Sequence, residues 1–304
     1  MIRASRHRNV KAPGTGCVLE KSALLAHDGI RTPERHMLSV DGLLADFTRF
    51  FPMSLASDAS RYLVFAGALA GLLWLLPAGW TAARRLQSKL ASGPDRRREI
   101  VYSLQTVLIF ALTGYAVHAA ARHGLVTIKR GLPADELLQA GATLVLMIVA
   151  HDAYFYWTHR AMHHPRLFRF FHRTHHRSHA PTPWAAYAFD WPEAIVQAMF
   201  LPLFVLCVPV HGIVSYLFLT HMILRNVMAH AGVELFPRGW AGSRWLGWMT
   251  ATSHHDQHHA TSRWNYGLYF TWWDRLMGTE HPDYVSTFDR ATGRAAHASA
   301  AVRS

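Results

Sequence analysis

The sequence predicts an all-α integral membrane protein with about four to five membrane-inserted helices and a helical, histidine-rich cap on the cytoplasmic side. Composition is the first observation behind this prediction. Of the 304 residues, 51% are hydrophobic and only 16% are charged, which is a low charged fraction for a soluble protein of this size. The second is that the apolar residues form long runs, followed by histidines with helical spacing.

Four apolar stretches account for the composition, and the first three are each close to the roughly 20 residues that a helix needs to cross a bilayer. The first three are residues 62–80, 100–120 and 137–157. The fourth, residues 194–224, is interrupted by prolines and a glycine, so we predict a hairpin of two short spans. Buried helices of a soluble protein are the alternative, but four such stretches are hard to bury in one chain without lipid.

Positive charge predicts the orientation of these spans. The loop after the first stretch is strongly basic, whereas the loop after the second has few basic residues, and basic loops tend to stay in the cytoplasm. The basic residues of the first loop are Arg84, Arg85, Lys89, Arg96, Arg97 and Arg98. The third stretch and the hairpin then both end in the cytoplasm. We attribute the net charge of +12 to a membrane surface and expect no nucleic acid as a partner.

We expect three parts along the chain. Residues 1–60 have a mixed composition without a sustained period, which predicts a poorly ordered extension, with an interfacial helix at 41–51. Residues 61–281 form the membrane-embedded domain. Residues 282–304 are rich in Ala, Ser, Thr and Arg, and this composition predicts a disordered tail.

The number and spacing of the histidines are the main indication of the protein's chemistry. Fifteen of the 22 lie between residues 151 and 259, and three groups have helical spacing, so each group is expected to point its imidazoles at one spot. The groups are His159 and His163, then His172, His175 and His176, then His255, His258 and His259. Neutral imidazole binds Fe, Zn, Cu and Ni. Eight such ligands exceed the four of one tetrahedral zinc ion, so the spacing predicts a site for two metal ions.

Other residues near the three groups are expected to complete this site. A ligating imidazole needs an acceptor at its second ring nitrogen, and nearby carboxylates are candidates to supply it. These carboxylates are Asp152, Asp190, Glu193, Glu234, Asp256 and Asp274. We take Asp256 and Glu234 as the candidate catalytic residues. Further possible ligands are His151, His164, His179, His221, His230 and His254, with His230 favoured because it follows the hairpin on the same side.

Several functions fit a pair of metals at a membrane surface. Two iron ions can reduce dioxygen and so oxidise an unactivated C–H bond of a lipid. A haem-binding electron-transfer protein is an alternative, but the grouped histidines outnumber those that haem pairs require. A metal carrier usually has its ligands inside the spans. A hydrolase with two zinc ions needs an open metal position and a general base, and it stays open as well.

Three segments that carry these histidines resemble the fatty acid hydroxylase/sterol desaturase superfamily. They are residues 151–184, residues 226–237 (NVMAHAGVELFP), and HHDQHH together with NYGLYFTWWDRLMGT at 265–279. The resemblance covers about residues 140–281 and is strongest to bacterial members usually labelled sterol desaturase family proteins. One difference is the sequence DWPE at 190–193, where similar proteins often carry His-Pro before the glutamate.

The resemblance implies a non-haem centre with two iron ions and dioxygen as cosubstrate, which hydroxylates or desaturates a lipid. Its ligands would be the eight grouped histidines and His230, which matches a family histidine between the second and third groups. A separate electron donor is implied, either a ferredoxin or a b-type cytochrome with its reductase. The implied location is the bacterial inner membrane, with the active site on the cytoplasmic side. Which lipid is oxidised stays open.

Overall fold

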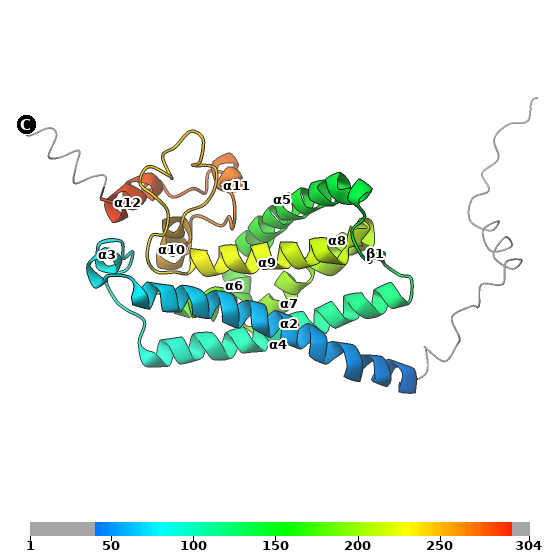
Figure 1. Ribbon diagram of the computed structural model, residues 1–304. Helices are drawn as coiled ribbons and strands as arrows, with labels where there is room; N and C mark the ends of the chain where they lie inside the picture. The colour runs from blue at the N-terminus through cyan, green and yellow to red at the C-terminus, as the bar shows by residue number, and fades with distance from the viewer. Residues whose placement is uncertain (1–39, 294–304) are drawn as a thin grey trace, which may run out of the picture. The chain divides into compact units, whose positions relative to one another are not determined.

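The computed structural model describes residues 40–293, whose regular secondary structure is almost entirely helical (Figure 1). The described residues from 47 onward belong to one compact unit, which contains all three histidine groups. Four helices are long: α2 (Val40–Leu75), α4 (Gly93–Arg122), α5 (Leu137–Met162) and α9 (Gly212–Ala229). The shorter helices are α3 (Ala78–Ala83), α6 (Pro165–Phe171), α7 (Trp191–Ala198), α8 (Phe200–Cys207), α10 (Thr252–Thr261), α11 (Trp272–Leu276) and α12 (Tyr284–Ala291).

Three short 3₁₀ helices and one small sheet complete the described fold. The 3₁₀ helices are η2 (Ala134–Glu136), η3 (His175–Arg177) and η4 (Pro183–Tyr187). Strands β1 (Ile128–Lys129) and β2 (Val210–His211) form a parallel pair, with Ile128 opposite Val210. The pair ties the segment before α5 to the segment before α9, so these two helices start close to each other.

Three helical segments are long and apolar enough to cross a membrane. They are residues 93–122, 134–162 and 212–229, and only 28%, 22% and 39% of their most apolar windows are buried. Leucines such as Leu138, Leu146 and Leu217 are therefore exposed along them. Continuous exposed apolar surface of this kind is a property of lipid-facing helices, not of core helices in a soluble protein. The prediction of an all-α membrane protein is confirmed.

The spans differ in detail from the predicted ones. The second and third stretches correspond to α4 and α5, and the hairpin corresponds to the apolar segment Trp191–Cys207 followed by α9. The first stretch, 62–80, is interrupted, because α2 ends at Leu75 and Pro77 precedes α3. Proline has no backbone N–H and disfavours helical backbone in the residue before it. Helix α2 is not among the three candidate spans.

The two ends of the described chain are more helical than expected. Residues 40–60 belong to α2, so the prediction of a poorly ordered extension over 1–60 is wrong for these residues. The helix predicted at 41–51 is part of α2. Helix α12 lies inside the predicted tail of 282–304, and its Tyr284 and Phe288 are buried. The remainder of both predictions, at 1–39 and 294–304, lies outside the described residues.

Helix packing brings the histidine groups together. Helix α4 packs on η4 and α7, and the hydroxyls of Tyr62 and Ser103 both donate to the carbonyl of Trp184, at 2.9 and 2.8 Å. Helix α9 packs on α5 and η4, and α10 packs on α9 and α12 (Figure 1). The cytoplasm-directed ends predicted for α5 and α9 therefore meet the segment that carries the third histidine group.

Candidate metal centre

All nine predicted metal ligands lie in two neighbouring clusters. Cluster 1 consists of His159, His163, His172, His176 and His258, and cluster 2 of His175, His230, His255 and His259. The candidate ligand atoms of each cluster lie within 4.8 Å of one another. Eight of the nine side chains are buried and His163 is partly buried. The imidazole centroids of His172 and His175 are 5.1 Å apart, so the clusters are in contact.

The sequence groups do not correspond to the clusters one by one. His255 and His259 are four residues apart on α10 and belong to cluster 2, whereas His258 on the same helix belongs to cluster 1. The second group is divided as well, with His175 in cluster 2 and the other two members in cluster 1. The expectation that each group points at one spot is therefore wrong. Helix α10 lies between the clusters and contributes to both.

The local backbone explains how the second group is divided. The second group does not lie on one continuous helix, because α6 stops at Phe171 and His172 is its C-terminal cap. The chain then makes a turn and continues as η3, which begins at His175. A 3₁₀ turn rotates successive side chains by a larger angle than an α-helix does. His175 and His176 consequently point into different clusters.

The same ring nitrogen, Nε2, faces inward throughout both clusters. In cluster 1 the Nε2 atom of His159 lies 2.9 Å from that of His172. The Nε2 atom of His258 lies 3.0 Å from those of His163 and His176. In cluster 2 the Nε2 atom of His230 lies 3.1 to 3.3 Å from its three neighbours. Nine imidazoles thus present one type of atom to two common points.

The outward nitrogens of three imidazoles are held by backbone carbonyls. Nδ1 of His159 donates to Tyr266 at 2.8 Å, and Nδ1 of His258 donates to Trp264 at 2.7 Å. Nδ1 of His230 donates to the carbonyl of Asn226 at 2.8 Å, one turn earlier in α9. Because a carbonyl can only accept, the hydrogen of each neutral ring is on Nδ1 and its Nε2 carries a lone pair.

These tautomers decide what the inward nitrogens can bind. Two lone pairs that face each other at about 3 Å repel, so the contacts between Nε2 atoms are not stabilising hydrogen bonds. A cation at the common point removes the repulsion by accepting the lone pairs. Nitrogen ligands about 2.1 Å from one metal ion are about 3.0 to 3.4 Å from each other. The observed spacing therefore fits a metal ion in each cluster.

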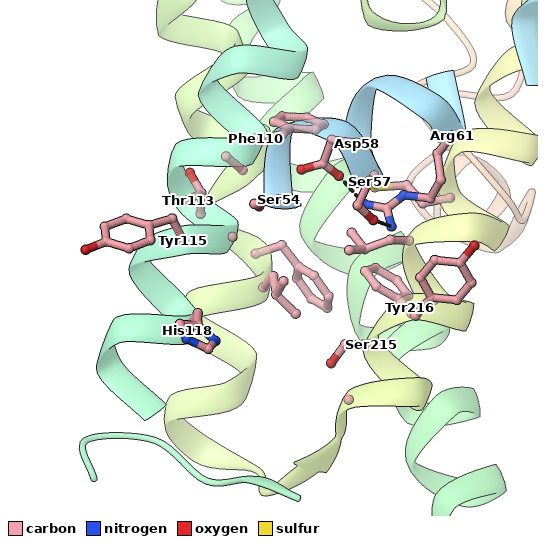
Figure 2. A pocket seen from close by; sticks show the side chains of 18 of the residues that line it. Ser54, Ser57, Asp58, Arg61, Phe110, Thr113, Tyr115, His118, Ser215 and Tyr216 are labelled. Atoms are coloured by element: carbon pink, nitrogen blue, oxygen red, sulfur yellow. Dashed lines mark hydrogen bonds and ion pairs between the residues drawn. The ribbon is translucent and has the colours of Figure 1, made fainter. Parts of the chain in front are cut away.

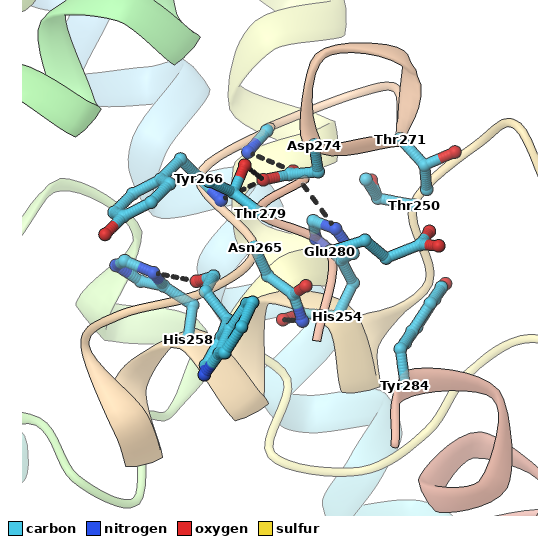
Figure 3. Close-up of polar contacts among 12 residues, drawn as sticks. Thr250, His254, His258, Asn265, Tyr266, Thr271, Asp274, Thr279, Glu280 and Tyr284 are labelled. Carbon is cyan, nitrogen blue, oxygen red and sulfur yellow. Dashed lines mark hydrogen bonds and ion pairs between the residues drawn. The ribbon is translucent and has the colours of Figure 1, made fainter. Parts of the chain in front are cut away.

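A buried carboxylate supports the loop that supplies two of these carbonyls. Asp274 accepts the backbone N–H groups of Tyr266 and Gly267 at 2.9 and 2.8 Å, and the Thr279 hydroxyl at 2.8 Å (Figure 3). Its other contact is Nε2 of His254 at 3.3 Å, and both side chains of this pair are fully buried. Asp274 thus holds the loop whose carbonyls orient His159 and His258.

Among the described residues, only one of the six predicted carboxylates bonds a cluster imidazole directly. Oε1 of Glu193 lies 2.7 Å from Nδ1 of His172. Asp190 caps the N-terminus of α7, and Asp152 accepts the N–H groups of Tyr269 and Phe270. In place of carboxylates, the structure uses backbone carbonyls, which no side-chain pattern in a sequence can reveal.

The two candidate catalytic residues face away from the clusters. Glu234 accepts the N–H groups of Phe236 and Ser253, at 3.0 and 2.8 Å, and so links the loop after α9 to the first turn of α10. Asp256 accepts a hydrogen bond from Gln87 at 2.5 Å. Burial raises the pKa of Asp256 to about 7 and raises that of Glu234. These contacts indicate support for α10.

The further histidines considered as ligands belong to neither cluster. His151 bonds the hydroxyl of Tyr269 at 2.9 Å, and His221 packs its ring against the same tyrosine. His254 contacts Asp274, and His164 caps the N-terminus of α6. His179 is exposed. The structure therefore separates His230, which joins cluster 2, from the five others.

Burial keeps the clustered imidazoles neutral. Desolvation, with added repulsion between the imidazoles in most cases, lowers the pKa of His176 to about 3 and that of His230 to about 4. It also brings the pKa of His175, His255 and His259 well below the ordinary value. Neutral imidazole is the form that binds metals, so the site is prepared for ligation at neutral pH.

Comparison with known proteins matches the part of the chain that carries the two histidine clusters. Residues 144–279, which include all nine histidines, match the family model described as fatty acid hydroxylase. A Delta(7)-sterol 5(6)-desaturase of Gibberella zeae is 34% identical over 136 residues, which cover 44% of this chain and 40% of the relative. Human lathosterol oxidase is 27% identical over 188 residues, covering 60% of each chain.

A third relative and the structural search complete the comparison. Methylsterol monooxygenase 1 of Rattus norvegicus is 32% identical over 136 residues, covering 43% of this chain and 44% of the relative. The matches thus span between 40% and 60% of the length of these three relatives. No solved structure matches this chain. The family match and these relatives cover the part of the chain that carries both histidine clusters, and this part is therefore similar to the fatty acid hydroxylase/sterol desaturase superfamily.

Proposed function

We propose that this protein is a membrane-bound lipid oxidase with two iron ions, which uses dioxygen and electrons from a separate donor to hydroxylate or desaturate a sterol or related lipid. The observation that carries the proposal is the inward convergence of nine Nε2 atoms in two contacting clusters. The relatives named as sterol desaturases, a lathosterol oxidase and a methylsterol monooxygenase support the substrate class.

The iron ions would supply the redox chemistry that reduces dioxygen and removes hydrogen from an unactivated carbon. Hydroxylation consumes one dioxygen, two electrons and two protons, and yields the alcohol and one water. Desaturation consumes the same reactants and yields the alkene and two waters. Both outcomes need electrons from outside, and we infer a ferredoxin or a b-type cytochrome with its reductase as the donor.

The protein's own groups prepare the site for this chemistry. The carbonyls of Tyr266, Trp264 and Asn226 keep hydrogen on Nδ1, so that Nε2 stays available for the metal. Glu193 does the same for His172 through a carboxylate, which would add negative charge near a metal ion held by neutral imidazoles. Burial of eight of the nine imidazoles keeps water away from the reacting carbon.

The position of the clusters suits a lipid substrate. His159 is near the end of the candidate span 134–162, and His230 is the first residue after the span 212–229. The metal centre would therefore lie at one membrane surface, where a lipid can enter from the bilayer. We infer the cytoplasmic face of the bacterial inner membrane, because the basic loop between α2 and α4 lies on the same side as these ends.

Metal and product analysis test the proposal together. Purified protein loaded anaerobically with Fe²⁺ is expected to hold two iron ions per chain. Given dioxygen, reductant and membrane lipid, it is expected to yield a lipid that has gained one oxygen or lost two hydrogens, measured by mass spectrometry. A variant with His255 and His258 both changed to alanine is the control. Zinc in place of iron, a haem absorption band, or lipid turnover without dioxygen would each contradict the proposal.

A further inference from the structure

The aromatic side chains around cluster 1 differ in how easily they can be oxidised. Toward the interior of the candidate span, the neighbour of His159 is Phe155, with 4.9 Å between the ring centroids. Beyond it, His151 lines a cavity of about 620 Å³, whose wall also carries the ion pair of Asp58 and Arg61 (Figure 2). The benzene ring of phenylalanine is very hard to oxidise, so Phe155 is an insulating side chain between the metal centre and this cavity.

A tyrosine, which is far easier to oxidise, lies beside the same cluster. The ring centroid of Tyr266 is 5.7 Å from that of His159, 5.2 Å from that of His163 and 5.5 Å from that of His258. The backbone carbonyl of Tyr266 also accepts the hydrogen bond from Nδ1 of His159. Tyr266 is therefore coupled to the ligand set both through its ring and through a hydrogen bond.

From Tyr266, a series of rings leads to the protein surface, and we call these four residues the aromatic chain. Tyr156 follows at 6.2 Å, Trp273 stacks on Tyr156 at 5.9 Å, and Trp157 lies 5.3 Å from Tyr156 and 5.8 Å from Trp273. Tyr156 is fully buried, whereas Trp157 is 46% exposed. Trp157 is near the end of the candidate span 134–162, where tryptophan is favoured at a membrane surface. An electron can therefore move between cluster 1 and the surface in short steps from ring to ring.

Tyr156 also has an acceptor for the proton that a tyrosine loses when it is oxidised. Its hydroxyl lies 2.9 Å from that of Thr279, which in turn donates to Oδ1 of Asp274 at 2.8 Å (Figure 3). Because the Thr279 hydrogen points to the carboxylate, Tyr156 is the donor in its bond with Thr279. Arg160 donates to the Tyr156 oxygen at 3.1 Å and can keep this bond after the proton has left. The distances are those that proton transfer requires.

Packing accounts for only part of this arrangement. Aromatic pairs stabilise a core, and a buried tyrosine hydroxyl usually finds a hydrogen-bond partner. Packing does not require that oxidisable rings begin at the metal ligands and end at the surface, while phenylalanine lies on the side of the cavity. A metal centre that activates dioxygen holds a strong oxidant with nothing to attack whenever its lipid is absent. An outlet for that oxidant would protect the imidazole ligands from oxidation.

We propose that the aromatic chain carries oxidising equivalents from cluster 1 to the protein surface when no lipid is present to react. The inference rests on the proposed function, because a centre that activates dioxygen is what produces such equivalents. At the surface they are consumed by a water-soluble thiol, which reduces the exposed end of the aromatic chain.

Each passage moves one electron inward and restores the protein. Tyr156 gives one electron to the oxidised metal centre through the ring of Tyr266. Its proton moves to Thr279, while the Thr279 proton moves to Asp274. A tryptophan of the aromatic chain then returns an electron to Tyr156, and the protons move back. The tryptophan, now a radical cation, takes an electron from a thiol. Two passages convert two thiols into one disulfide and release two protons.

Photo-oxidation of the full-length, zinc-substituted protein in detergent tests the aromatic chain without iron chemistry. Zinc is not redox-active, so the oxidising equivalents come from illuminated ruthenium tris-bipyridine with persulfate in solution. After freezing, electron paramagnetic resonance should show a tyrosyl radical component that Tyr156→Phe removes and Tyr154→Phe retains. Tyr154 is the matched control, because it lies on the same helix and its hydroxyl donates to the Val196 carbonyl, outside the aromatic chain. The same radical signal in Tyr156→Phe and wild type would overturn the proposal.

The paired variant Trp157→Phe with Trp273→Phe tests the connection to the surface. It leaves the hydrogen bonds of Tyr156 intact, so it separates conduction from a structural role of that hydroxyl. The radical component assigned to Tyr156 should be lost in this variant. Trp245→Phe, at an exposed tryptophan outside the aromatic chain, should keep the component. An undiminished component in the paired variant would show that Tyr156 is oxidised by another route and would refute the aromatic chain.

The iron-loaded protein, given dioxygen, a chemical reductant and glutathione, tests the protective role. Without lipid, peptides that carry the cluster 1 histidines should gain oxygen several-fold faster in Tyr156→Phe and in the paired tryptophan variant than in the wild type, as measured by mass spectrometry. With lipid present, all three proteins should form the lipid product at the same initial rate. Equal oxidation of these peptides in all three proteins would contradict the protective role.

The outcomes separate this inference from the proposed function. Lipid oxidation by the iron-loaded protein, without a Tyr156 radical in the zinc-substituted protein, would remove this inference alone. A Tyr156 radical in the zinc-substituted protein, without lipid oxidation by the iron-loaded protein, would remove the proposed function and leave conduction by the aromatic chain supported.

Discussion

Oε1 of Glu193 lies 2.7 Å from Nδ1 of His172, and both side chains are almost completely buried. Burial disfavours charge on each of them, so it raises the pKa of Glu193 and lowers that of His172. A cation bound to the other nitrogen of His172 would reverse this preference, because it stabilises the carboxylate and the Nδ1–H donor. The pair is therefore a sensitive reporter of metal in cluster 1.

Glu193→Gln should weaken metal binding at cluster 1. The amide keeps the shape of the side chain but removes the negative charge beside His172, and loss of such a contact commonly costs about 10- to 100-fold in metal affinity. Competition with a chelator of known affinity measures this effect. Asp190→Asn, three residues earlier, is the control, because Asp190 caps α7 and bonds Thr174 without touching an imidazole. Equal affinities for both variants would contradict the role given to Glu193.

The two clusters should tolerate the loss of a ligand differently. His176→Ala leaves four imidazoles in cluster 1, whereas His255→Ala leaves three in cluster 2. We expect His255→Ala to lose one of the two iron ions and His176→Ala to retain more of its metal, as measured by elemental analysis after desalting. His179→Ala, at an exposed histidine outside both clusters, should bind as the wild type does. Identical losses in all three variants would argue against separate clusters.

Asp274→Asn should destabilise the protein and loosen the loop at 264–267. An asparagine cannot accept from Tyr266, Gly267 and Thr279 while it faces His254, and breaking a buried pair costs about 3 to 5 kcal/mol. Thermal unfolding in detergent should show a clearly lower midpoint, together with weaker metal binding. Glu280→Gln is the control, because its bond to Arg275 is solvent-exposed and contributes at most about 1 kcal/mol. An unchanged midpoint in Asp274→Asn would contradict the supporting role of Asp274.

Acid should destabilise the metal-free protein below about pH 6.5, the ordinary pKa of histidine. The pKa of His176 falls to about 3 and that of His230 to about 4 in the folded state, from an ordinary value of 6.5. Between these values the unfolded chain binds more protons than the folded one, so stability decreases as the pH falls. Buried carboxylates with a raised pKa, such as Asp256, Glu193 and Glu234, act in the opposite direction, but the imidazoles with a lowered pKa outnumber them.

Differential scanning fluorimetry of the metal-free protein at about pH 7 and about pH 5, on either side of the ordinary histidine pKa, measures this dependence. The midpoint should be lower at the acidic pH, and iron-loaded protein should show a smaller change as long as ligation keeps the imidazoles neutral. A midpoint that is the same or higher at the acidic pH in the metal-free protein would show that the folded state does not exclude protons from these rings.

Local sequence was a good guide to the ligand set but a poor one to its arrangement. Histidine spacing and position after apolar stretches identified all nine residues that the structure brings together, including His230, which stands alone in the sequence. The sequence did not predict that the second histidine group is divided between the two clusters, because this division depends on where α6 ends and η3 begins. The first apolar stretch was misjudged for a similar reason, since Pro77 ends α2 within it.

The sequence by itself determined that the chain forms membrane helices and concentrates imidazoles after them, because hydropathy and side-chain chemistry are properties of residues and short segments. Only the tertiary structure decided which imidazoles share a cluster, which carbonyls orient them, and that Asp58 and Arg61 lie in the wall of a cavity. These relationships join residues separated by tens of positions. They follow from how α2, α4, α5, α9 and α10 pack on one another, which no local pattern specifies.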